Sequence, residues 1–356
     1  MTYASLAQDP DGALAAALTG EVAGVAVATS GSSGEPRLAL VSGAALRASA
    51  EATHERLGGP GRWLLALPSD RIAGAQVLVR SALGGRPAVR MRPGSFDPRA
   101  FAETTVATRA DTAARIPLYV SLVPTQLRRI ADDPGAASAL EAFDAILVGG
   151  AAFRAEGAPP NAIETYGSTE TAGGCVYDGR PLPGVAVDTD ADGRVLVSGQ
   201  VLFDGYADGG DDGTIDRDGV RWLRMPDVGA LADGRLAVLG RADEVIVTGA
   251  FKVHPATVER ALLALPEVAD AVVVAAPDEE WGERIVAVVT VADDRAPIAV
   301  EALRVALASS LPRHALPRQV LVLQSLPLLD SGKIDRGAAR ALASGSSGGS
   351  RARDDA

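Results

Sequence analysis

Hydrophobic residues in the first 150 positions follow two alternating patterns. Short apolar runs, typical of buried strands, are separated by longer stretches in which apolar residues recur every three or four positions, as in helices that bury one face. The predicted strands are Val22–Ala28, Trp63–Leu67, Leu118–Leu122 and Ala145–Val148, and the predicted helices are Ala44–Leu57, Ala75–Leu83 and Pro124–Ile130. Ser42 is placed to cap the first helix. Strands that alternate with helices predict an α/β domain with parallel pairing.

The pattern changes twice further along the chain. From about Pro183, strands with period-two alternation are divided by Asp-Gly turns, which predicts a small antiparallel section. After Gly240 strands and helices alternate again, which predicts a compact α+β unit. We therefore predict a large domain over 1–240, a small C-terminal domain over 241–342 and a disordered Gly/Ser-rich tail over 343–356.

Length, charge and the rarer residues narrow the class of protein. A chain of 356 residues is too long for one ordinary core, and we expect neither a membrane span nor a secretory signal. The single cysteine, Cys175, excludes an internal disulfide framework and predicts a cytoplasmic location. A net charge of −11 argues against broad binding of nucleic acid or anionic membranes. Three scattered histidines offer little material for a zinc site or a Ser-His-Asp triad.

The stretch TSGSSGEPR, Thr29–Arg37, follows directly on the first predicted strand. Gly31 and Gly34 allow backbone N–H groups to turn toward a ligand, and the neighbouring hydroxyls can donate to phosphate oxygens. Arg37 adds a fixed positive charge. The spacing is not that of a Walker P-loop, and a flexible connection is the alternative. Its position after a buried strand favours phosphate binding.

A second stretch, TYGSTE, carries residues suited to a nucleotide. The ring of Tyr166 can stack on a purine, the backbone can approach closely at Gly167, and Thr169 and Glu170 offer a hydroxyl and a carboxylate to phosphate and Mg²⁺. A surface turn with a half-buried tyrosine is the alternative.

Two further sets lie nearer the C-terminus. Asp227 and Arg241 could hold two adjacent ribose hydroxyls, one residue accepting and the other donating hydrogen bonds. In LPLLDSGKIDR, the ammonium of Lys333 could reach a developing oxyanion. Taken singly, Asp227 could be an acid in a turn, Arg241 a base on the surface and Lys333 a solvated lysine.

The order and spacing of these stretches resemble the adenylate-forming superfamily, which contains acyl-CoA synthetases, nonribosomal-peptide adenylation domains and luciferases. The six matching stretches span roughly residues 25–337 and are TSGSSGEPR, TYGSTE, GRVLVSG with Gly205-Tyr206, the segment around Asp227, GRADEVIVTGAFKVHPATVE and SGKIDR. Six motifs in the family's order outweigh the separate alternative for each one. The resemblance implies a large α/β domain followed by a mobile α+β domain.

The resemblance also implies an activity. The protein is expected to be an ATP-dependent ligase that forms an acyl-AMP from a carboxylic acid and passes the acyl group to CoA. ATP and CoA would be its co-substrates and Mg²⁺ its cofactor. It assigns ATP binding to Thr29, Ser30, Gly31, Ser32, Ser33, Gly34, Arg37, Gly149, Gly150, Tyr166, Gly167, Asp227 and Arg241. It assigns catalysis to Lys333, Glu170 and Thr169, with Glu170 as the Mg²⁺ ligand. Asp243 is implied as the hinge, and Gly249 lies near the expected route of the CoA thiol.

Within the superfamily, the chain resembles short bacterial o-succinylbenzoate–CoA ligases of menaquinone biosynthesis. The phosphate loop begins at residue 29, which predicts a large domain truncated at its N-terminus, and LPSDRIAGAQVLVRS, SLVPTQLRR and YGSTETAGGCVYDG resemble that subfamily. An acid with two carboxylates needs a second anchor, and Arg80 has the spacing of the subfamily's anchoring arginine. Ser121, Thr125 and Tyr177 are further pocket candidates. The alternative for Arg80 is a helix-surface arginine with a buried stem.

Two departures from the family pattern bear on the acid. Arg37 replaces the usual lysine of the phosphate loop, and Asp70-Arg71 replace the usual histidine segment, which alters the floor of the expected acyl pocket. The alternatives are a ligase for another aromatic or aliphatic acid, an adenylation enzyme that loads a carrier protein, and a catalytically silent nucleotide-binding relative. No carrier segment is evident, and the residues assigned to catalysis are retained. A homodimer that covers exposed apolar surface is a further expectation.

Overall fold

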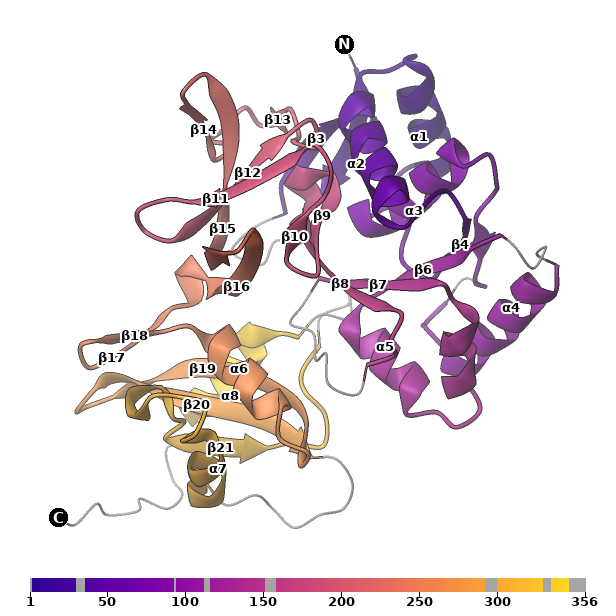
Figure 1. Ribbon diagram of the computed structural model, residues 1–356. Helices are drawn as coiled ribbons and strands as arrows, with labels where there is room; N and C mark the ends of the chain where they lie inside the picture. Colours follow the sequence, from indigo (N-terminus) through magenta and orange to yellow (C-terminus); the bar gives the residue numbers. More distant parts are fainter. Residues whose placement is uncertain are drawn as a thin grey trace. The chain divides into compact units, whose positions relative to one another are not determined.

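The computed structural model describes residues 2–29, 36–92, 94–111, 116–150, 158–291, 300–328 and 334–345. The chain divides into two compact units, whose elements are labelled in Figure 1. The first unit comprises Met1–Met225 and Gly229–Ala237, and the second comprises Pro226–Val228 and Val238–Ala356. The domain assignment made from the sequence, with its boundary at residue 240, stays a prediction.

A seven-stranded sheet forms the centre of the first unit. Its strands in spatial order are β10 (Arg180–Pro181), β9 (Gly173–Tyr177), β8 (Ala162–Ser168), β7 (Ala145–Gly149), β6 (Leu118–Leu122), β4 (Arg62–Leu65) and β5 (Val89–Arg90). The five strands from β8 to β5 are parallel, whereas β9 and β10 pair antiparallel. The parallel α/β domain predicted from the apolar runs is confirmed.

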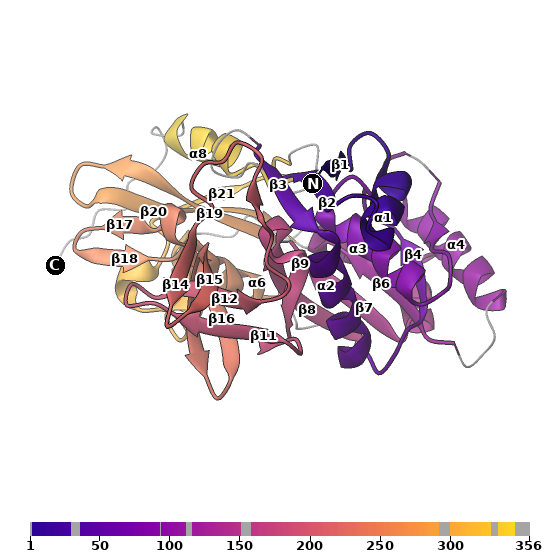
Figure 2. The ribbon, with the colours of Figure 1, turned by 90° about the horizontal axis from the view of Figure 1, so that it is seen from above.

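Helices cover both faces of this sheet, as Figures 1 and 2 show. The helices of the first unit are α1 (Pro10–Thr19), α2 (Gly43–Arg56), α3 (Ile72–Leu83), α4 (Pro98–Ala110) and α5 (Pro124–Ala131), with 3-10 turns η1 (Ala137–Ala142) and η2 (Thr169–Thr171). Successive side chains of a strand point to opposite faces. Trp63 and Leu65 therefore pack with α2 and α3, while Leu64 packs with α4 and α5. The predicted cap is also present, because the Ser42 side chain accepts a hydrogen bond from the backbone N–H of Ala45.

Two smaller sheets follow, and both belong to the first unit except for Pro226–Val228 and residues 238–241, which are counted with the second unit. One consists of β1 (Tyr3–Ser5), β2 (Gly24–Ala28), β3 (Leu38–Ser42) and β13 (Gly205–Tyr206), and the other of β11 (Val185–Thr189), β12 (Arg194–Gly199), β15 (Val220–Ala232), β14 (Thr214–Arg217) and β16 (Arg235–Arg241). The predicted Asp-Gly turns close its hairpins. Asp218 and Gly219 have φ of 58° and 77°, and Asp233 and Gly234 have 52° and 69°, the left-handed conformations that tight hairpin turns need.

The second unit is the predicted α+β unit. Its sheet contains β18 (Phe251–Val253), β17 (Ile246–Thr248), β20 (Gly282–Val291), β19 (Val268–Asp278) and β21 (Gln319–Val322), and its helical segments are η3 (Ala242–Glu244), α6 (Pro255–Leu263), α7 (Val300–Leu307), η4 (Arg313–Ala315) and α8 (Arg336–Gly345). α6 and α7 pack on one face, with Val273 and Ala287 in the shared core. α8 packs on the other, with Val272 and Val286.

One boundary differs from the sequence-based prediction. The disordered tail was expected from residue 343, but α8 continues to Gly345 and Ala343 is fully buried. Ala339 and Ala343 are one helical turn apart, so both alanines face the same core and extend the helix. Residues 346–356 lie outside the described residues.

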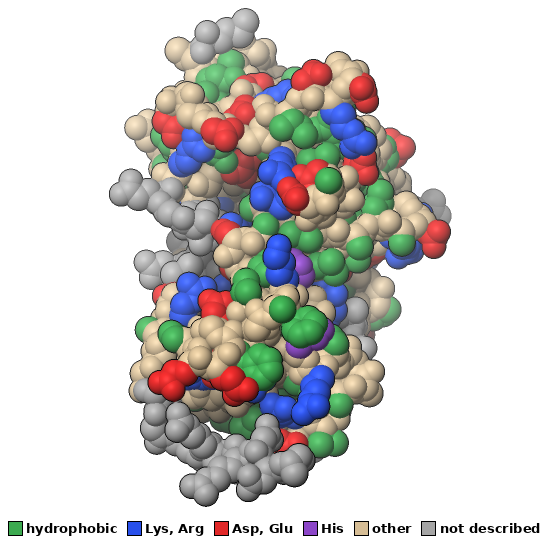
Figure 3. All heavy atoms as spheres, turned by 90° about the vertical axis from the view of Figure 1, so that its left-hand side faces the viewer, with side chains coloured by type: hydrophobic (Ala, Val, Ile, Leu, Met, Phe, Trp, Pro, Cys, Tyr) green, Lys and Arg blue, Asp and Glu red, His purple; other side chains and the backbone are tan. Residues whose placement is uncertain are grey.

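The described helices and surface add two observations. Every helix in the described ranges is too short or too polar to cross a bilayer. On the face shown in Figure 3, acidic and basic side chains of the described residues are interspersed. Ion pairs among the described residues include Arg217 with Asp188 at 2.6 Å and Arg224 with Asp190 at 2.6 Å, so many acidic side chains have a basic neighbour.

Candidate active site

The ends of β7 and β8 lie side by side and carry several predicted nucleotide-binding residues. Gly149 is opposite Thr165 in the register, and an added Cβ at this glycine would lie 2.4 Å from the threonine hydroxyl. Gly150 has φ of 88°, a conformation that glycine adopts at little cost. At Gly167 an added Cβ would lie 2.2 Å from the carbonyl oxygen of Gly173. Backbone packing therefore requires glycine at 167, and the Thr165 side chain leaves no room for a Cβ at 149.

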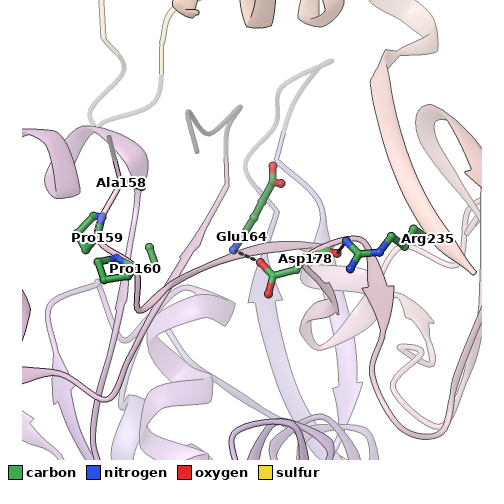
Figure 4. A pocket seen from close by; sticks show the side chains of 7 residues that line it. Ala158, Pro159, Pro160, Glu164, Asp178 and Arg235 are labelled. Carbon is green, nitrogen blue, oxygen red and sulfur yellow. Dashed lines mark hydrogen bonds between the residues drawn. The ribbon is translucent and has the colours of Figure 1, made fainter. Parts of the chain in front are cut away.

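Tyr166 belongs to β8, so reading TYGSTE as a surface turn is wrong for its first residues; only Thr169 and Glu170 lie in the 3-10 turn that follows. A hollow of about 390 Å³ opens beside this strand, lined by Ala158, Pro159, Pro160, Ala162, Glu164, Asp178 and Arg235 (Figure 4). The backbone N–H of Glu164 donates to the Asp178 carboxylate at 3.0 Å, which fixes one wall. Glu164 and Tyr166 share a face of β8 because they are two residues apart. No pattern in the sequence indicated this hollow.

Glu170 and Arg37, predicted separately, are joined through Tyr206. The Tyr206 hydroxyl donates to Glu170 Oε1 at 2.7 Å, and the Arg37 guanidinium lies 3.6 Å above the tyrosine ring. Arg37 also makes two hydrogen bonds to the Asp208 carboxylate, at 2.7 and 2.8 Å, and one to the carbonyl of Asp211 at 2.9 Å. The Arg37 hydrogen bonds hold the pKa of Asp208 at about 2. The fixed charge expected at the phosphate loop is therefore already paired with a carboxylate.

Tyr206 and Asp208 contact the predicted site residues but were not predicted as site residues from the sequence. The signal available for the tyrosine was its place in the Gly205-Tyr206 motif; nothing marked the aspartate. Tyr206 is half-buried, and burial together with the nearby Glu170 carboxylate raises its pKa well above the usual range. The phenol therefore keeps its proton at neutral pH and stays a donor to Glu170.

The base of the predicted phosphate loop is closed by a short pairing. The backbone N–H of Thr29 donates to the carbonyl of Arg37 at 2.8 Å, and the N–H of Arg37 donates to the threonine hydroxyl at 3.1 Å. Thr29 follows β2 directly, as predicted from its position after a buried strand. The remaining predicted loop residues, Ser30, Gly31, Ser32, Ser33 and Gly34, lie outside the described residues.

Arg80 is a buried arginine, which excludes the reading as a surface side chain. It lies in α3 with 3% of its surface exposed, and its Nη2 donates to the Tyr177 hydroxyl at 3.4 Å. That hydroxyl also bonds to Thr53 Oγ1 at 3.0 Å, and the guanidinium lies 5.1 Å from the centre of the Trp63 ring. Within the described part of the chain, no carboxylate pairs with Arg80 and its Nε has no hydrogen-bond partner. Burial consequently lowers the pKa of Arg80.

Other buried polar atoms without a hydrogen-bond partner among the described residues lie in the same layer, between α2, α3 and the sheet. The buried atoms that lack a hydrogen-bond partner among the described residues include His54 Nε2, Trp63 Nε1, Gln76 Oε1 and Ser81 Oγ. Burial, and secondarily the charge of Arg80, lowers the pKa of His54. Most buried polar groups in proteins are hydrogen-bonded. A layer with several unpaired ones is therefore suited to a polar ligand.

The other predicted pocket residues are less closely grouped. Ser121 is buried on β6, on the same face as Tyr119, whose ring lies 5.1 Å from that of Trp63. It therefore faces the layer that contains Arg80. Thr125 is half-buried at the start of α5, the helix on the other side of the sheet. The structure thus brings Arg80 and Tyr177 into contact, while Thr125 belongs to a different helix, α5.

In the second unit, the predicted ribose and hinge residues form a pair. Arg241 makes two hydrogen bonds to Asp243, at 2.8 and 2.7 Å, and these bonds raise the pKa of the arginine. Asp227 acts on the same guanidinium electrostatically, which places it nearby. The family resemblance assigned Arg241 and Asp243 to separate functions, whereas in the structure they are direct partners.

Gly249 and Lys333 are the last predicted site residues. Gly249 has φ of 60°, and an added Cβ would lie 2.9 Å from the Trp281 ring, so glycine is required there by both conformation and space. Its N–H donates to the carbonyl of Trp281 at 2.8 Å. Lys333 lies outside the described residues; Ile334, which follows it, pairs with Leu328 in an antiparallel bridge.

Comparison with known proteins establishes the family. Residues 257–333 match the family model of the AMP-binding enzyme C-terminal domain. The probable 2-succinylbenzoate–CoA ligase of Mycobacterium tuberculosis is 42% identical over 322 residues, which cover 88% of this chain and 82% of that protein. The chain belongs to the adenylate-forming acyl-CoA ligases. The predicted superfamily, the likeness to o-succinylbenzoate–CoA ligases and the enzyme class, an AMP-forming acid–thiol ligase, are confirmed.

Solved structures of this superfamily share the fold. The o-succinylbenzoate CoA synthetase from Bacillus subtilis, in complex with its acyl-adenylate intermediate, superposes with a TM-score of 0.73 at 24% identity, over 90% of this chain and 69% of that one. The amide bond synthetase from Marinactinospora thermotolerans superposes with a TM-score of 0.77 at 27% identity, over 90% and 68% of the two chains. This ligase therefore has the adenylate-forming fold in both of its units.

Proposed function

We propose that this ligase activates o-succinylbenzoate with ATP and transfers the acyl group to CoA, releasing AMP and pyrophosphate. The M. tuberculosis relative, at 42% identity, carries this acid in its name and supports the choice. The observation that carries it is Arg80, a guanidinium buried in α3 with no carboxylate partner among the described residues.

A second carboxylate on the substrate fits the surroundings of Arg80. Burial of an unpaired charge costs several kcal/mol, so the site gains most from a ligand that brings the missing negative charge. o-Succinylbenzoate has two carboxylates; one reacts and the other keeps its charge. The Arg80 fork can donate to this carboxylate. The Tyr177 hydroxyl accepts from the same guanidinium at 3.4 Å and is paired with Thr53 at 3.0 Å, so it helps to orient the arginine. Ser121 and Thr125 remain proposed pocket residues.

For ATP, we propose the residues that the family resemblance assigns. Gly149, Gly150, Tyr166 and Gly167 lie at adjacent strand ends with closely packed backbones, which suits an approach to the flat base. Thr29 closes the base of the phosphate loop, where its hydroxyl accepts a hydrogen bond from the N–H of Arg37. Arg241 uses two of its five N–H donors on Asp243, so donors remain for a ribose hydroxyl beside Asp227.

The residues present also fit a Mg²⁺ ion carried by ATP. Such an ion usually takes one or two protein carboxylates together with phosphate oxygens and water. Glu170 offers one oxygen to Tyr206 at 2.7 Å and keeps the other for a metal, with the Thr169 hydroxyl next to it in the chain. Bound there, the ion would neutralise phosphate charge; Tyr206 fixes the carboxylate that holds it.

The proposed reaction has two steps. A carboxylate oxygen of the acid attacks the α-phosphorus of ATP, and the bond to pyrophosphate breaks. The sulfur of CoA, after losing its proton, then attacks the acyl carbon, and AMP leaves. Lys333 is proposed to stabilise the charge that develops in the first step, Asp243 to act as hinge and Gly249 to border the thiol route.

Pyrophosphate exchange tests this proposal directly. Purified protein, ATP, Mg²⁺ and o-succinylbenzoate should exchange labelled pyrophosphate into ATP without CoA, and addition of CoA should release AMP and the thioester. Exchange no faster than in a Lys333→Ala control would refute it. Exchange without CoA-dependent turnover would favour the carrier-loading alternative, and ATP binding in a calorimeter without exchange would favour the silent relative.

The proposal also includes the cellular location and the oligomeric state of the protein. A cytoplasmic location is supported by Cys175, the only cysteine of the chain, which is buried as a free thiol. A homodimer remains a prediction that sedimentation velocity over a range of protein concentrations would test.

A further inference from the structure

At one edge of the sheet in the second unit, formed by β19, an ion pair occupies the outward backbone groups of Val273. β19 is the outermost strand beside β20, and the outward backbone groups of Val273 have no neighbouring strand among the described residues. The N–H of Val273 donates to Glu259 Oε1 at 2.8 Å, and its carbonyl accepts from Arg336 Nη1 at 3.1 Å. The two side chains bond to each other as well, with Arg336 Nη2 2.7 and 2.8 Å from the Glu259 oxygens. A carboxylate and a guanidinium thus take the place of a strand.

The Glu259 side chain is the buried member of this pair. Its carboxylate is 4% exposed, against 29% for the Arg336 side chain. Burial raises the pKa of Glu259, while Arg336 and the Val273 N–H act in the opposite direction. A carboxylate in this position depends on its arginine, because removal of one partner leaves the other charge buried and unpaired.

Arg336 also contacts the segment that contains the predicted hinge. Its Nε lies 3.4 Å from Glu244 Oε2, and the other oxygen of Glu244 lies 3.8 Å from Arg241 Nε. Arg241 is in turn bonded to Asp243. A continuous series of charged side chains therefore runs from the hinge segment to the first residue of α8.

The beginning of α8 adjoins the lysine proposed for adenylation. Arg336 is three residues after Lys333, and the two residues between them are anchored: Ile334 pairs with Leu328, and the N–H of Asp335 donates to the carbonyl of Pro327 at 2.8 Å. These contacts and the Arg336–Glu259 pair leave the chain little freedom immediately after Lys333.

We infer that Arg336 is a positioning residue for Lys333: its pair with Glu259, together with its contact to Glu244, fixes the chain at Ile334 and Asp335, directly after the lysine. The inference rests on the proposed role of Lys333 in adenylation. A displacement of about 1 Å in a reacting group can cost about a hundredfold in rate. Loss of the guanidinium is therefore expected to slow the step that uses Lys333 and to spare the step that does not.

The two half-reactions separate these effects. In Arg336→Gln, pyrophosphate exchange should fall by about a hundredfold, toward the Lys333→Ala level, while thioester formation from purified acyl-adenylate and CoA changes less than about threefold. Arg336→Lys keeps the charge but lacks the planar fork, so it should recover only part of the exchange. Arg304→Gln is the matched control, because Arg304 forms a looser pair, at 3.8 Å, with the exposed Glu301.

A readout independent of turnover keeps the inference testable if a variant is unstable or the wild type accepts a different acid. In Arg336→Gln, hydrogen exchange at the amides of Ile334 and Asp335 should accelerate at least about tenfold, and in Arg304→Gln it should not. The double variant Glu259→Leu, Arg336→Met removes both charges and should fold while exchange of pyrophosphate stays slow. Equal loss in both half-reactions, or unchanged amide exchange in Arg336→Gln, would overturn the inference. Absence of pyrophosphate exchange in the wild type with every acid would count against the proposed function. The hydrogen exchange of the Ile334 and Asp335 amides would still decide the role of Arg336.

Discussion

Replacement of Arg80 by methionine is expected to stabilise the fold while it weakens activity on o-succinylbenzoate. Methionine has a similar length and no charge, so it can fill the space between α3 and Trp63. The two expectations have opposite signs because the unpaired charge of Arg80 lowers the stability of the ligand-free enzyme but is available to bind the substrate carboxylate.

The magnitude follows from the contacts of Arg80. Burial of its charge, with 3% of the residue exposed, costs several kcal/mol. Against this stand a long hydrogen bond of 3.4 Å to Tyr177, worth about 1 kcal/mol at most, and a cation–π contact at 5.1 Å, worth about 0.5–2 kcal/mol. The balance predicts a gain of about 1–3 kcal/mol in the free energy of unfolding. Loss of a charged hydrogen bond to the substrate, about 1.5–3 kcal/mol, predicts a fall of about 10- to 150-fold in kcat/KM.

Urea unfolding and steady-state kinetics measure the two effects. Unfolding of wild type and Arg80→Met should be followed by circular dichroism, and kcat/KM should be compared for o-succinylbenzoate and benzoate, which lacks the second carboxylate. In Arg80→Met, kcat/KM should fall by the full predicted factor for o-succinylbenzoate and by much less for benzoate.

Arg336→Met is a control for the stability measurement, because it should lower the free energy of unfolding whereas Arg80→Met should raise it. It breaks the pair with Glu259, and because the Arg336 side chain is 29% exposed we expect a loss of about 2–3 kcal/mol, below the cost for a fully buried pair. If Arg80→Met also lowered the free energy of unfolding, the reasoning that its charge is uncompensated would be refuted. An equal change in kcat/KM for both acids would refute its role as the anchor.

Three further predictions concern the first unit. Tyr206→Phe removes the 2.7 Å hydrogen bond to Glu170 and should raise the Mg²⁺ concentration for half-maximal pyrophosphate exchange by about tenfold, with an unchanged titration as the contrary result. Burial raises the pKa of the Cys175 thiol from 9.0 to about 12, so above pH 9 the unfolded chain loses this proton before the folded chain does. Stability should then fall with rising pH by up to about 1.4 kcal/mol per unit, and Cys175→Ala should flatten the urea midpoint between pH 9 and 11. Gly167→Ala places a Cβ 2.2 Å from the Gly173 carbonyl and should cost about 1–3 kcal/mol in urea unfolding, whereas wild-type stability would show that the strand can shift.

The sequence predicted most of the regular elements, because their signals are local. Apolar runs marked β6 and β7, a serine hydroxyl marked the start of α2, and Asp-Gly pairs marked the hairpin turns. α4 was missed although a signal was present: Asp97 caps it from directly before Pro98, a frequent first residue of helices. Its threonine-rich sequence has a weak apolar periodicity, which concealed it.

The family was also recognisable from the sequence, since ordered motifs need no knowledge of contacts. The motifs assigned Glu170, Arg37 and Arg241 to single tasks. The structure adds their partners: Tyr206 on Glu170, Asp208 on Arg37 and Asp243 on Arg241. Two of these pairs join residues that are 36 and 171 positions apart, a separation at which sequence periodicity carries no information.

Local signals in the chain thus specify the order of strands and helices, the two-part organisation expected of its family and the candidate residues of the site. Three-dimensional packing was needed to show that Arg80 is buried without a carboxylate partner among the described residues and touches Tyr177, 97 positions away. It was also needed to show that Glu259 and Arg336, 77 positions apart, pair with each other and with the backbone of Val273 at the edge of β19. The physical reason is the same in both cases. Whether a charge is exposed, paired or left alone depends on which surfaces the sheets and helices bring together, and periodicity along the chain records only the face on which a residue lies.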